Sequence, residues 1–135
     1  MAYLHELKTY ASDRGTLTVL ENLMPGTIQR VFYIHGAGSS PRAGHRHQRA
    51  WNALVCLSGH CRVYSHNGRE EITYILSDPQ QCLVLEPEDW HITDRFSADA
   101  ILLVVSNEAY DRAEYIYEPY SNSQYVYEPA LAHLE

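Results

Sequence analysis

The chain has 135 residues, of which 45% are hydrophobic and 20% are charged, and its formal net charge is −7. This length predicts one domain with a core of its own, and the acidic balance argues against a nucleic-acid-binding protein. No apolar run approaches the ~20 residues of a membrane-spanning helix, and no signal peptide is expected. Three cysteines without CxxC spacing predict free buried thiols in a cytoplasmic protein.

Short runs of β-branched and aromatic residues, separated by Gly, Pro, Asn and Asp, predict a succession of β-strands. The expected strands cover residues 3–10, 17–20, 28–34, 51–57, 61–65, 71–76, 82–85, 90–94 and 100–105. Strands 51–57 and 61–65 are expected to pair as a hairpin around Ser58-Gly59, and Asn67-Gly68 predicts a second hairpin. Between Asn107 and Tyr115 we expect only one or two helical turns.

This spacing of strands, about one every 8 to 12 residues, is typical of all-β sandwiches and barrels. We therefore expect a single all-β domain over residues 1–120. Residues 121–135 form a tyrosine-containing tail, expected to pack on the barrel or on a second subunit, or else to be a poorly ordered terminus. The final pair, Leu134-Glu135, is typical of a cloning remnant and carries no weight.

Two histidines, His45 and His47, stand two residues apart in an arginine-rich stretch that runs from Arg42 to Arg49. In an extended strand, residues i and i+2 project from the same face, so the two imidazoles are expected to lie side by side. Such a pair can share a metal ion or a substrate proton. The alternative is a polar strand edge with two solvated histidines.

The acidic residues are unevenly distributed along the chain. No Asp or Glu occurs between Glu21 and Glu70, and the same interval contains Arg30, Arg42, Arg46, Arg49, Arg62 and Arg69. Because arginine binds phosphate oxygens with a planar fork of donors, this interval predicts a site for an anion. Chance segregation on a solvated sheet face is the competing interpretation.

A barrel with a His-x-His pair and a later histidine, His91, indicates a cupin-type site. A metal-binding cupin needs a carboxylate a few residues after the pair, but residues 48–52 contain none, and Arg46 and Arg49 oppose a cation. The metal-free interpretation is acid–base chemistry, because a neutral imidazole moves protons readily near neutral pH. Neither a Gly-x-Ser-x-Gly motif nor a glycine-rich phosphate loop is present.

An ordered set of motifs between residues 13 and 120 points to a known family. The set comprises Asp13-Arg14-Gly15, Arg30-Val31 with Tyr33, Pro41-Arg42, His45-x-His47, the block 54–63, Trp90-His91, Phe96-Ser97, Tyr110-Asp111 and Glu114-Tyr115-Ile116. On these residues the chain resembles the dTDP-sugar 3,4-ketoisomerases, the cupin enzymes of the FdtA/QdtA-like or WxcM-like type.

This resemblance implies a cupin-type double-stranded β-helix, or jelly-roll barrel, that forms a homodimer and needs no metal or other cofactor. The implied reaction moves the keto group of a dTDP-4-keto-6-deoxyhexose from C4 to C3 through an enediol, in deoxyamino-sugar biosynthesis. The implied roles are His45 as the base, His47 as its partner or proton relay, and Tyr33 as their support. Substrate binding is assigned to Arg14, Arg30, Arg42, Asn52 and His91.

The combination of Arg14 and His91 is typical of members that form the galacto-type product. The chain departs from the family at Gln48, where lysine is usual, at Ala43-Gly44, where Gly and an aromatic residue are common, and at Asn52, Ile92 and Arg95. These departures leave the sugar, the nucleotide and the C4 configuration open. Two other functions compete: a metal-dependent cupin that uses His45, His47 and His91, and a non-catalytic nucleotide-sugar-binding module.

Overall fold

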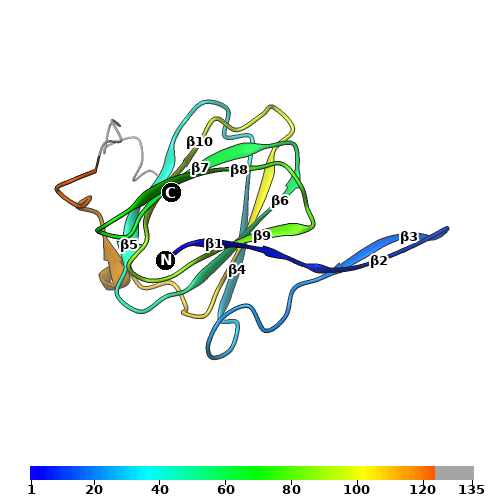
Figure 1. The fold of residues 1–135 in the computed structure, drawn as a ribbon, viewed down its shortest axis with the longest axis horizontal. Helices are drawn as coiled ribbons and strands as arrows, with labels where there is room; N and C mark the ends of the chain where they lie inside the picture. Colours follow the sequence, from blue (N-terminus) through cyan, green and yellow to red (C-terminus); the bar gives the residue numbers. More distant parts are fainter. Residues whose placement is uncertain (124–135) are drawn as a thin grey trace.

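The computed structural model describes residues 1–123, and the greater part of the predicted tail lies outside them. Antiparallel strands dominate the fold (Figure 1). The strands are β1 (Tyr3–Glu6), β2 (Lys8–Ser12), β3 (Gly15–Val19), β4 (Arg30–His35), β5 (Arg42–His47), β6 (Asn52–Ser58), β7 (Cys61–His66), β8 (Glu71–Leu76), β9 (Gln81–Leu85), β10 (Trp90–Asp94), β11 (Ile101–Ser106) and β12 (Tyr115–Ile116).

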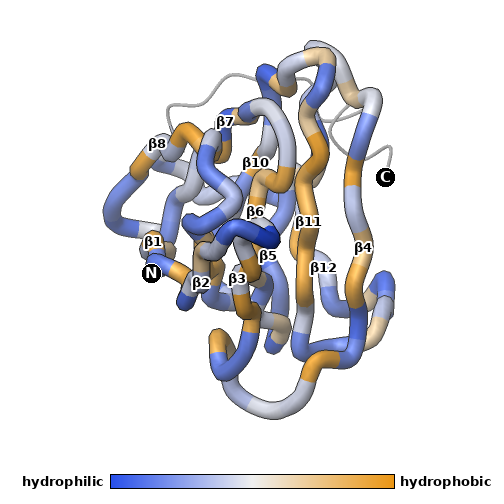
Figure 2. The backbone as a smooth tube through the Cα atoms, turned by 90° about the vertical axis from the view of Figure 1, so that its right-hand side faces the viewer, coloured by the Kyte–Doolittle hydropathy of each residue, from blue (hydrophilic) through white to orange (hydrophobic). Residues whose placement is uncertain are grey.

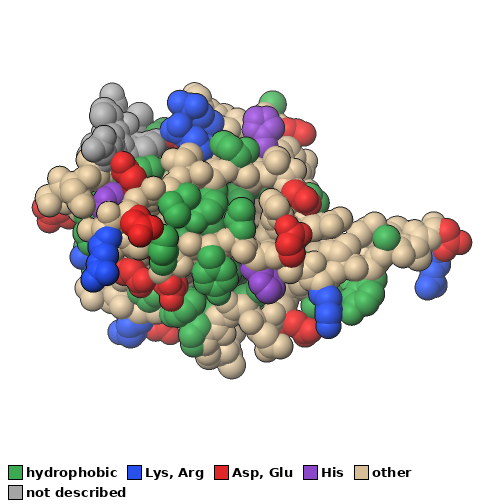
Figure 3. Space-filling view, viewed as in Figure 1, with side chains coloured by type: hydrophobic (Ala, Val, Ile, Leu, Met, Phe, Trp, Pro, Cys, Tyr) green, Lys and Arg blue, Asp and Glu red, His purple; other side chains and the backbone are tan. Residues whose placement is uncertain are grey.

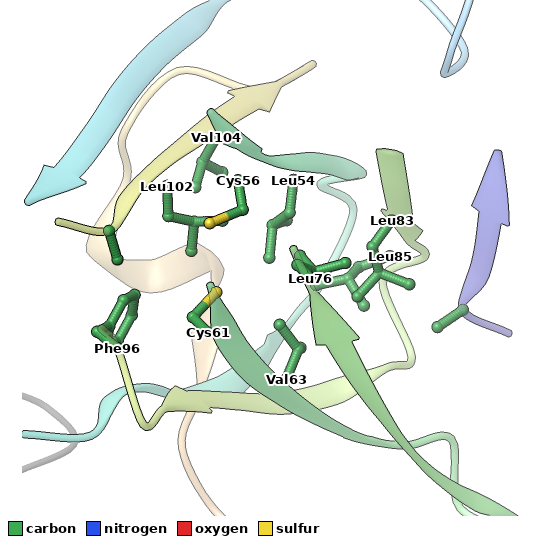
Figure 4. Packing of buried hydrophobic residues seen from close by; sticks show 12 residues of the cluster. Leu54, Cys56, Cys61, Val63, Leu76, Leu83, Leu85, Phe96, Leu102 and Val104 are labelled. Atoms are coloured by element: carbon green, nitrogen blue, oxygen red, sulfur yellow. The ribbon is translucent and has the colours of Figure 1, made fainter. Parts of the chain in front are cut away.

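Two five-stranded sheets make up the body of the molecule. One has the strand order β1-β9-β6-β11-β4 and the other has the order β12-β5-β10-β7-β8. Apolar side chains from both sheets meet between them, and they include Leu54 and Leu102 from the first sheet and Val63 and Leu76 from the second (Figure 4). The architecture is the expected jelly roll, and a cavity lined in part by residues of β4, β5 and β12 lies at one end of it.

The central strand of the first sheet, β11, is hydrophobic along almost its whole length (Figure 2). It pairs with β6 on one side and β4 on the other, so its backbone is fully used and both of its faces are covered. Strand β4 lies at the sheet edge and alternates, with Arg30, Phe32 and Ile34 turned inward and Val31 and Tyr33 exposed.

The predicted hairpin of strands 51–57 and 61–65 is wrong. Strand β6 pairs with β9 and β11, whereas β7 pairs with β8 and β10, so the turn at residues 58–60 carries the chain from one sheet to the other. Gly59 has a φ of +66°, and a Cβ there would lie 2.2 Å from the Ser97 hydroxyl. A tight turn at Gly59 suits both a hairpin and a crossing from one sheet to the other. The sequence alone could therefore not distinguish these two connections. The second predicted hairpin is confirmed, because β7 and β8 pair on either side of Asn67-Gly68.

The expected strand over residues 3–10 is divided at Leu7, which is buried and whose backbone N–H donates to the carbonyl of Gln80. Strand β1 joins the first sheet, while β2 pairs with β3 in a separate two-stranded sheet. Together β2 and β3 form an arm that projects from the body (Figure 3).

Of the one or two helical turns expected between Asn107 and Tyr115, the structure has one 3-10 turn, Arg112–Glu114. Within the described residues, no helix is long and apolar enough to cross a membrane.

Candidate active site

Three histidines converge inside the open end of the barrel. His45 and His47 lie on β5, and His91 is the register partner of His45 on the neighbouring strand β10. The ring centroids of His45 and His47 are 4.9 Å apart, and those of His45 and His91 are 5.0 Å apart. The expected side-by-side projection of His45 and His47 is therefore confirmed, and all three rings are at least nine-tenths buried.

A backbone irregularity sets the position of His45. Ala43 and Gly44 have positive φ values of 69° and 79°, and the pairing of β10 with β5 shifts its register between His91 and Ile92. Such a bulge rotates the side chains that follow it. The irregularity at Ala43 and Gly44 therefore sets the direction in which His45 leaves β5.

Burial keeps His47 and His91 uncharged. Desolvation, followed by the nearby His91 and by the Arg30 charge, lowers the pKa of His47 to about 3. Desolvation also lowers the pKa of His91 to about 4. The Nδ1 of His91 lies 3.1 Å from the carbonyl of Asp89, which can only accept, so Nδ1 carries the proton and Nε2 keeps its lone pair. At neutral pH, His47 and His91 are therefore both proton acceptors.

Two adjoining cavities meet at His45. The outer one has a volume of about 460 Å³ and is lined by Arg30, Ala43, His45, Tyr110, Arg112, Tyr115 and Tyr117. The inner one, of about 30 Å³, shares several of these residues and adds, among others, Phe32, Asn52, His91 and Thr93. The outer cavity has room for part of a nucleotide sugar, and two arginines line it.

The tyrosine-rich segment after β11 closes one side of this site. Strand β12 pairs with β5 and places Tyr115 opposite His47 in the register. The ring of Tyr115 stacks on His45 with centroids 4.4 Å apart, and its hydroxyl accepts a hydrogen bond of 2.8 Å from Arg30 Nη1. Sequence reasoning gave Tyr115, Tyr117, Tyr110 and Arg112 no role in the site, although the clustering of tyrosines in this segment was a usable signal.

A buried carboxylate fixes that segment to the barrel. Glu114 Oε1 accepts the backbone N–H groups of Arg49 and Ala50, each at 2.6 Å. In addition, the Gln48 N–H donates to the Glu114 carbonyl. Because these bonds join the end of β5 to the start of β12, they hold Tyr115 against His45.

The structure brings together five of the predicted site residues: His45, His47, Arg30, Asn52 and His91 line or flank the same cavities. The remaining three, Tyr33, Arg14 and Arg42, do not line these cavities within one chain. Tyr33 is 63% exposed and lies on the face of β4 opposite to Arg30, beside His35. Because β4 alternates, a single strand cannot turn both Arg30 and Tyr33 toward the histidines.

The other two residues outside these cavities are arginines. Arg14 lies in the turn between β2 and β3, at the end of the arm, and lines neither cavity of its own chain. Arg42 begins β5 opposite Thr93 but does not line either cavity.

The arginines of the acid-free interval have several different uses. Arg62 forms a two-pronged ion pair with Asp94, Arg49 pairs with Glu108, and Arg46 lies over the ring of Tyr120. Within residues 1–123, Arg30 is the one member of the interval that lines the cavities, and Arg112 joins it from outside the interval. The predicted anion site therefore rests on fewer of these arginines than the sequence indicated.

The three histidines also have the arrangement of a potential metal site, because one nitrogen from each lies within 4.8 Å of the others. Neutral imidazoles suit zinc, copper, iron and nickel. A second acidic group, formed by Glu86, Glu88 and Asp89, lies instead around the Met1 ammonium.

Comparisons with known proteins identify the family of the chain. The model of the family described as "FdtA: WxcM-like, C-terminal" matches residues 2–127. The TDP-4-oxo-6-deoxy-alpha-D-glucose-3,4-oxoisomerase of Aneurinibacillus thermoaerophilus is 37% identical over 114 residues, which cover 81% of each chain.

Solved structures are similar over most of the barrel. WlaRA, a TDP-fucose-3,4-ketoisomerase from Campylobacter jejuni, is 30% identical with a TM-score of 0.81, covering 87% of this chain and 89% of its own. A mutant of the 3,4-ketoisomerase QdtA from Thermoanaerobacterium thermosaccharolyticum, in complex with TDP-4-keto-6-deoxyglucose, is 30% identical with a TM-score of 0.80 and 87% coverage of both chains. The family match over nearly the whole described chain, together with the buried histidine cluster, places this protein in the FdtA, WxcM-like family.

Proposed function

We propose that this protein is a nucleotide-sugar 3,4-ketoisomerase that moves the keto group of a dTDP-4-keto-6-deoxyhexose from C4 to C3 in deoxysugar biosynthesis. The observation that carries the proposal is the position of His45, buried between two other histidines at the base of a cavity lined by arginines. The similarity to enzymes with this activity supports it.

The chemistry requires a base near C3, where the neighbouring ketone makes the C–H bond acidic. A neutral imidazole is suited to this task at neutral pH. In our proposal His45 removes the C3 proton, an enediol forms, and a proton returns to C4, with His47 as the partner or relay. Because His47 and His91 lie in the same buried cluster and are uncharged, they can pass the proton without leaving a buried charge behind.

Arginines are suited to the anionic part of such a substrate. Arg30 and Arg112 line the outer cavity, where a planar guanidinium can bind diphosphate oxygens in a bidentate manner. Asn52 and His91 lie deeper, in the inner cavity. His91, with Arg14, supports a galacto-type product. We propose that one cytoplasmic domain over residues 1–120 carries the whole activity, with no metal or other cofactor.

We further propose a homodimer that brings Arg14 to a site. Within residues 1–123, the arm of β2 and β3 pairs with no other strand, and it exposes Tyr10 and Leu17 by 58% and 60%. It projects toward the side on which the outer face of β4 lies, where Val31 and Tyr33 are also exposed (Figures 1 and 2). An arm that crosses to a second copy would cover both apolar surfaces and carry Arg14 toward the partner's barrel.

The test is turnover of dTDP-4-keto-6-deoxyglucose followed by NMR in deuterated water. Wild-type protein is expected to form the 3-keto isomer with solvent deuterium at carbon. His45→Asn should abolish this while keeping the melting temperature, and His60→Asn, an exposed residue outside the site, should keep wild-type turnover. Near-normal turnover by His45→Asn would remove His45 as the base.

The grouping of three histidine nitrogens within 4.8 Å favours one alternative, a metal-dependent cupin isomerase or dioxygenase. Elemental analysis and chelation separate the two: loss of turnover on chelation, restored by a metal, would support the metal enzyme. Binding of the sugar nucleotide without deuterium entering C3 or C4 would instead support a non-catalytic binding module.

A further inference from the structure

Tyr115 is held in the site by three separate contacts. Its ring stacks on His45 at 4.4 Å, its hydroxyl accepts from Arg30 at 2.8 Å, and its backbone pairs with β5 opposite His47. It lines both the outer and the inner cavity, as do Arg30 and His45. The phenol oxygen, the guanidinium and the imidazole therefore face the same space.

The proposed reaction needs more than a base for carbon. As the C3–H bond breaks, the C4 ketone oxygen becomes an enolate and must gain a proton. As C4 is protonated, the C3 hydroxyl must lose one. The histidines account for the two carbon-bound protons, so a separate donor and acceptor is required for the two oxygens.

We infer that Tyr115 is a catalytic residue that exchanges protons with the two sugar oxygens, an inference that rests on the proposed ketoisomerisation. Tyr115 gives its hydroxyl proton to O4 as the base removes the proton from C3, which leaves the enediol and a phenolate. The phenolate then takes the proton from O3 as the imidazolium returns a proton to C4. The phenol and the base both end as they began, and no redox partner is needed.

Arg30 is placed to stabilise the phenolate between these two steps. Its guanidinium lies 4.3 Å from the ring centroid of Phe32 and 5.1 Å from that of Tyr110. It forms no ion pair with a carboxylate within residues 1–123. Because no acid neutralises it there, its charge acts on the phenol oxygen through a charge-assisted hydrogen bond.

A purely structural Tyr115, whose ring only supports His45, is the competing interpretation. Tyr115→Phe separates the two because it keeps the stacked ring and removes only the hydroxyl. Tyr3→Phe is the control, since it also removes only a tyrosine hydroxyl, but Tyr3 is exposed on β1 and lines neither cavity.

The experiment measures kcat for the 3-keto product, hydrogen–deuterium exchange at C3, and the dissociation constant of TDP. For Tyr115→Phe we expect kcat and exchange to fall by about 10²- to 10⁴-fold, the usual range for a lost acid or base, with the TDP dissociation constant within about threefold of wild type. Arg30→Lys, which retains a cation, should lose less kcat than Arg30→Gln.

Wild-type-like kcat in Tyr115→Phe would overturn the inference. So would a fall in kcat matched by Tyr3→Phe, or a fall explained by weaker TDP binding alone. If wild-type protein itself neither exchanges C3 nor forms product, the proposed function fails and this inference fails with it. Turnover by wild type together with turnover by Tyr115→Phe removes only the role of Tyr115.

Discussion

Ala43 shows how one backbone position can determine the site. It adopts a left-handed φ of 69° and is buried beside His45, although this conformation costs a non-glycine residue about 1–2 kcal/mol. Glycine would relieve that strain at the cost of about 0.5–1 kcal/mol of backbone entropy.

We therefore expect Ala43→Gly to leave the free energy of unfolding unchanged or raise it by up to about 1 kcal/mol. Ala53→Gly, in a fully buried position of β6 with ordinary strand geometry, should lower it by at least about 1 kcal/mol. Urea denaturation of both variants measures the difference, and equal losses would show that Ala43 is not strained.

At the residue scale, local periodicity predicted the site only in part. His45 and His47 could be paired from their spacing, because two residues of one strand share a face whatever the strand packs against. The spacing could not show whether Tyr33 points toward the site, since that depends on which face of β4 is turned to the barrel interior. Tyr115 depends on a contact between β12 and β5, and no short-range pattern reports such a contact.

Among the elements, β12 has few contacts of its own and relies on Glu114. This carboxylate is 3% exposed and accepts two backbone N–H groups after β5. Removing it leaves buried donors unsatisfied, at about 1–3 kcal/mol for each group.

Glu114→Ala is expected to lower the free energy of unfolding by about 2–4 kcal/mol and to reduce turnover, because Tyr115 loses its support. The exposed Glu118, on the same segment, provides the control, and Glu118→Ala should change stability by no more than about 0.5 kcal/mol. Chemical denaturation with a parallel turnover assay gives both values. Similar losses in the two variants would contradict the role assigned to Glu114.

Strand positions were largely predictable because turn residues and alternation are local properties of the sequence. The choice of partner strand was not, and the turn at residues 58–60 shows why: a short glycine-containing connection serves a hairpin and a crossing between sheets equally well. The difference lies in the far contacts, where β6 meets β11 and β7 meets β10.

For the whole molecule, the apolar arm and the exposed face of β4 lead to a prediction about assembly. Wild-type protein should sediment at twice its 15.5 kDa chain mass. The double substitution Leu17→Asp and Val31→Asp should give a monomer, because it places charges on surfaces that the dimer would bury.

Ile75→Asp is the matched control, since Ile75 is 59% exposed on β8 in the other sheet. It should remain dimeric at the same micromolar concentration in analytical ultracentrifugation. A wild-type protein that sediments as a monomer would refute the proposed exchange of arms.

The pairing of strands also determines when the site can exist. Tyr3 lies opposite Val84, His45 opposite His91, and Arg30 opposite Ser106, so neighbours in space are distant along the chain. Folds dominated by such distant pairings lose the conformational entropy of long loops before the stabilising contacts form. They therefore fold slowly, in roughly milliseconds to seconds. During synthesis His45 emerges early, but it has no partner until the strand of His91 and then Tyr115 have left the ribosome. The catalytic centre is therefore among the last parts of the newly made chain to form.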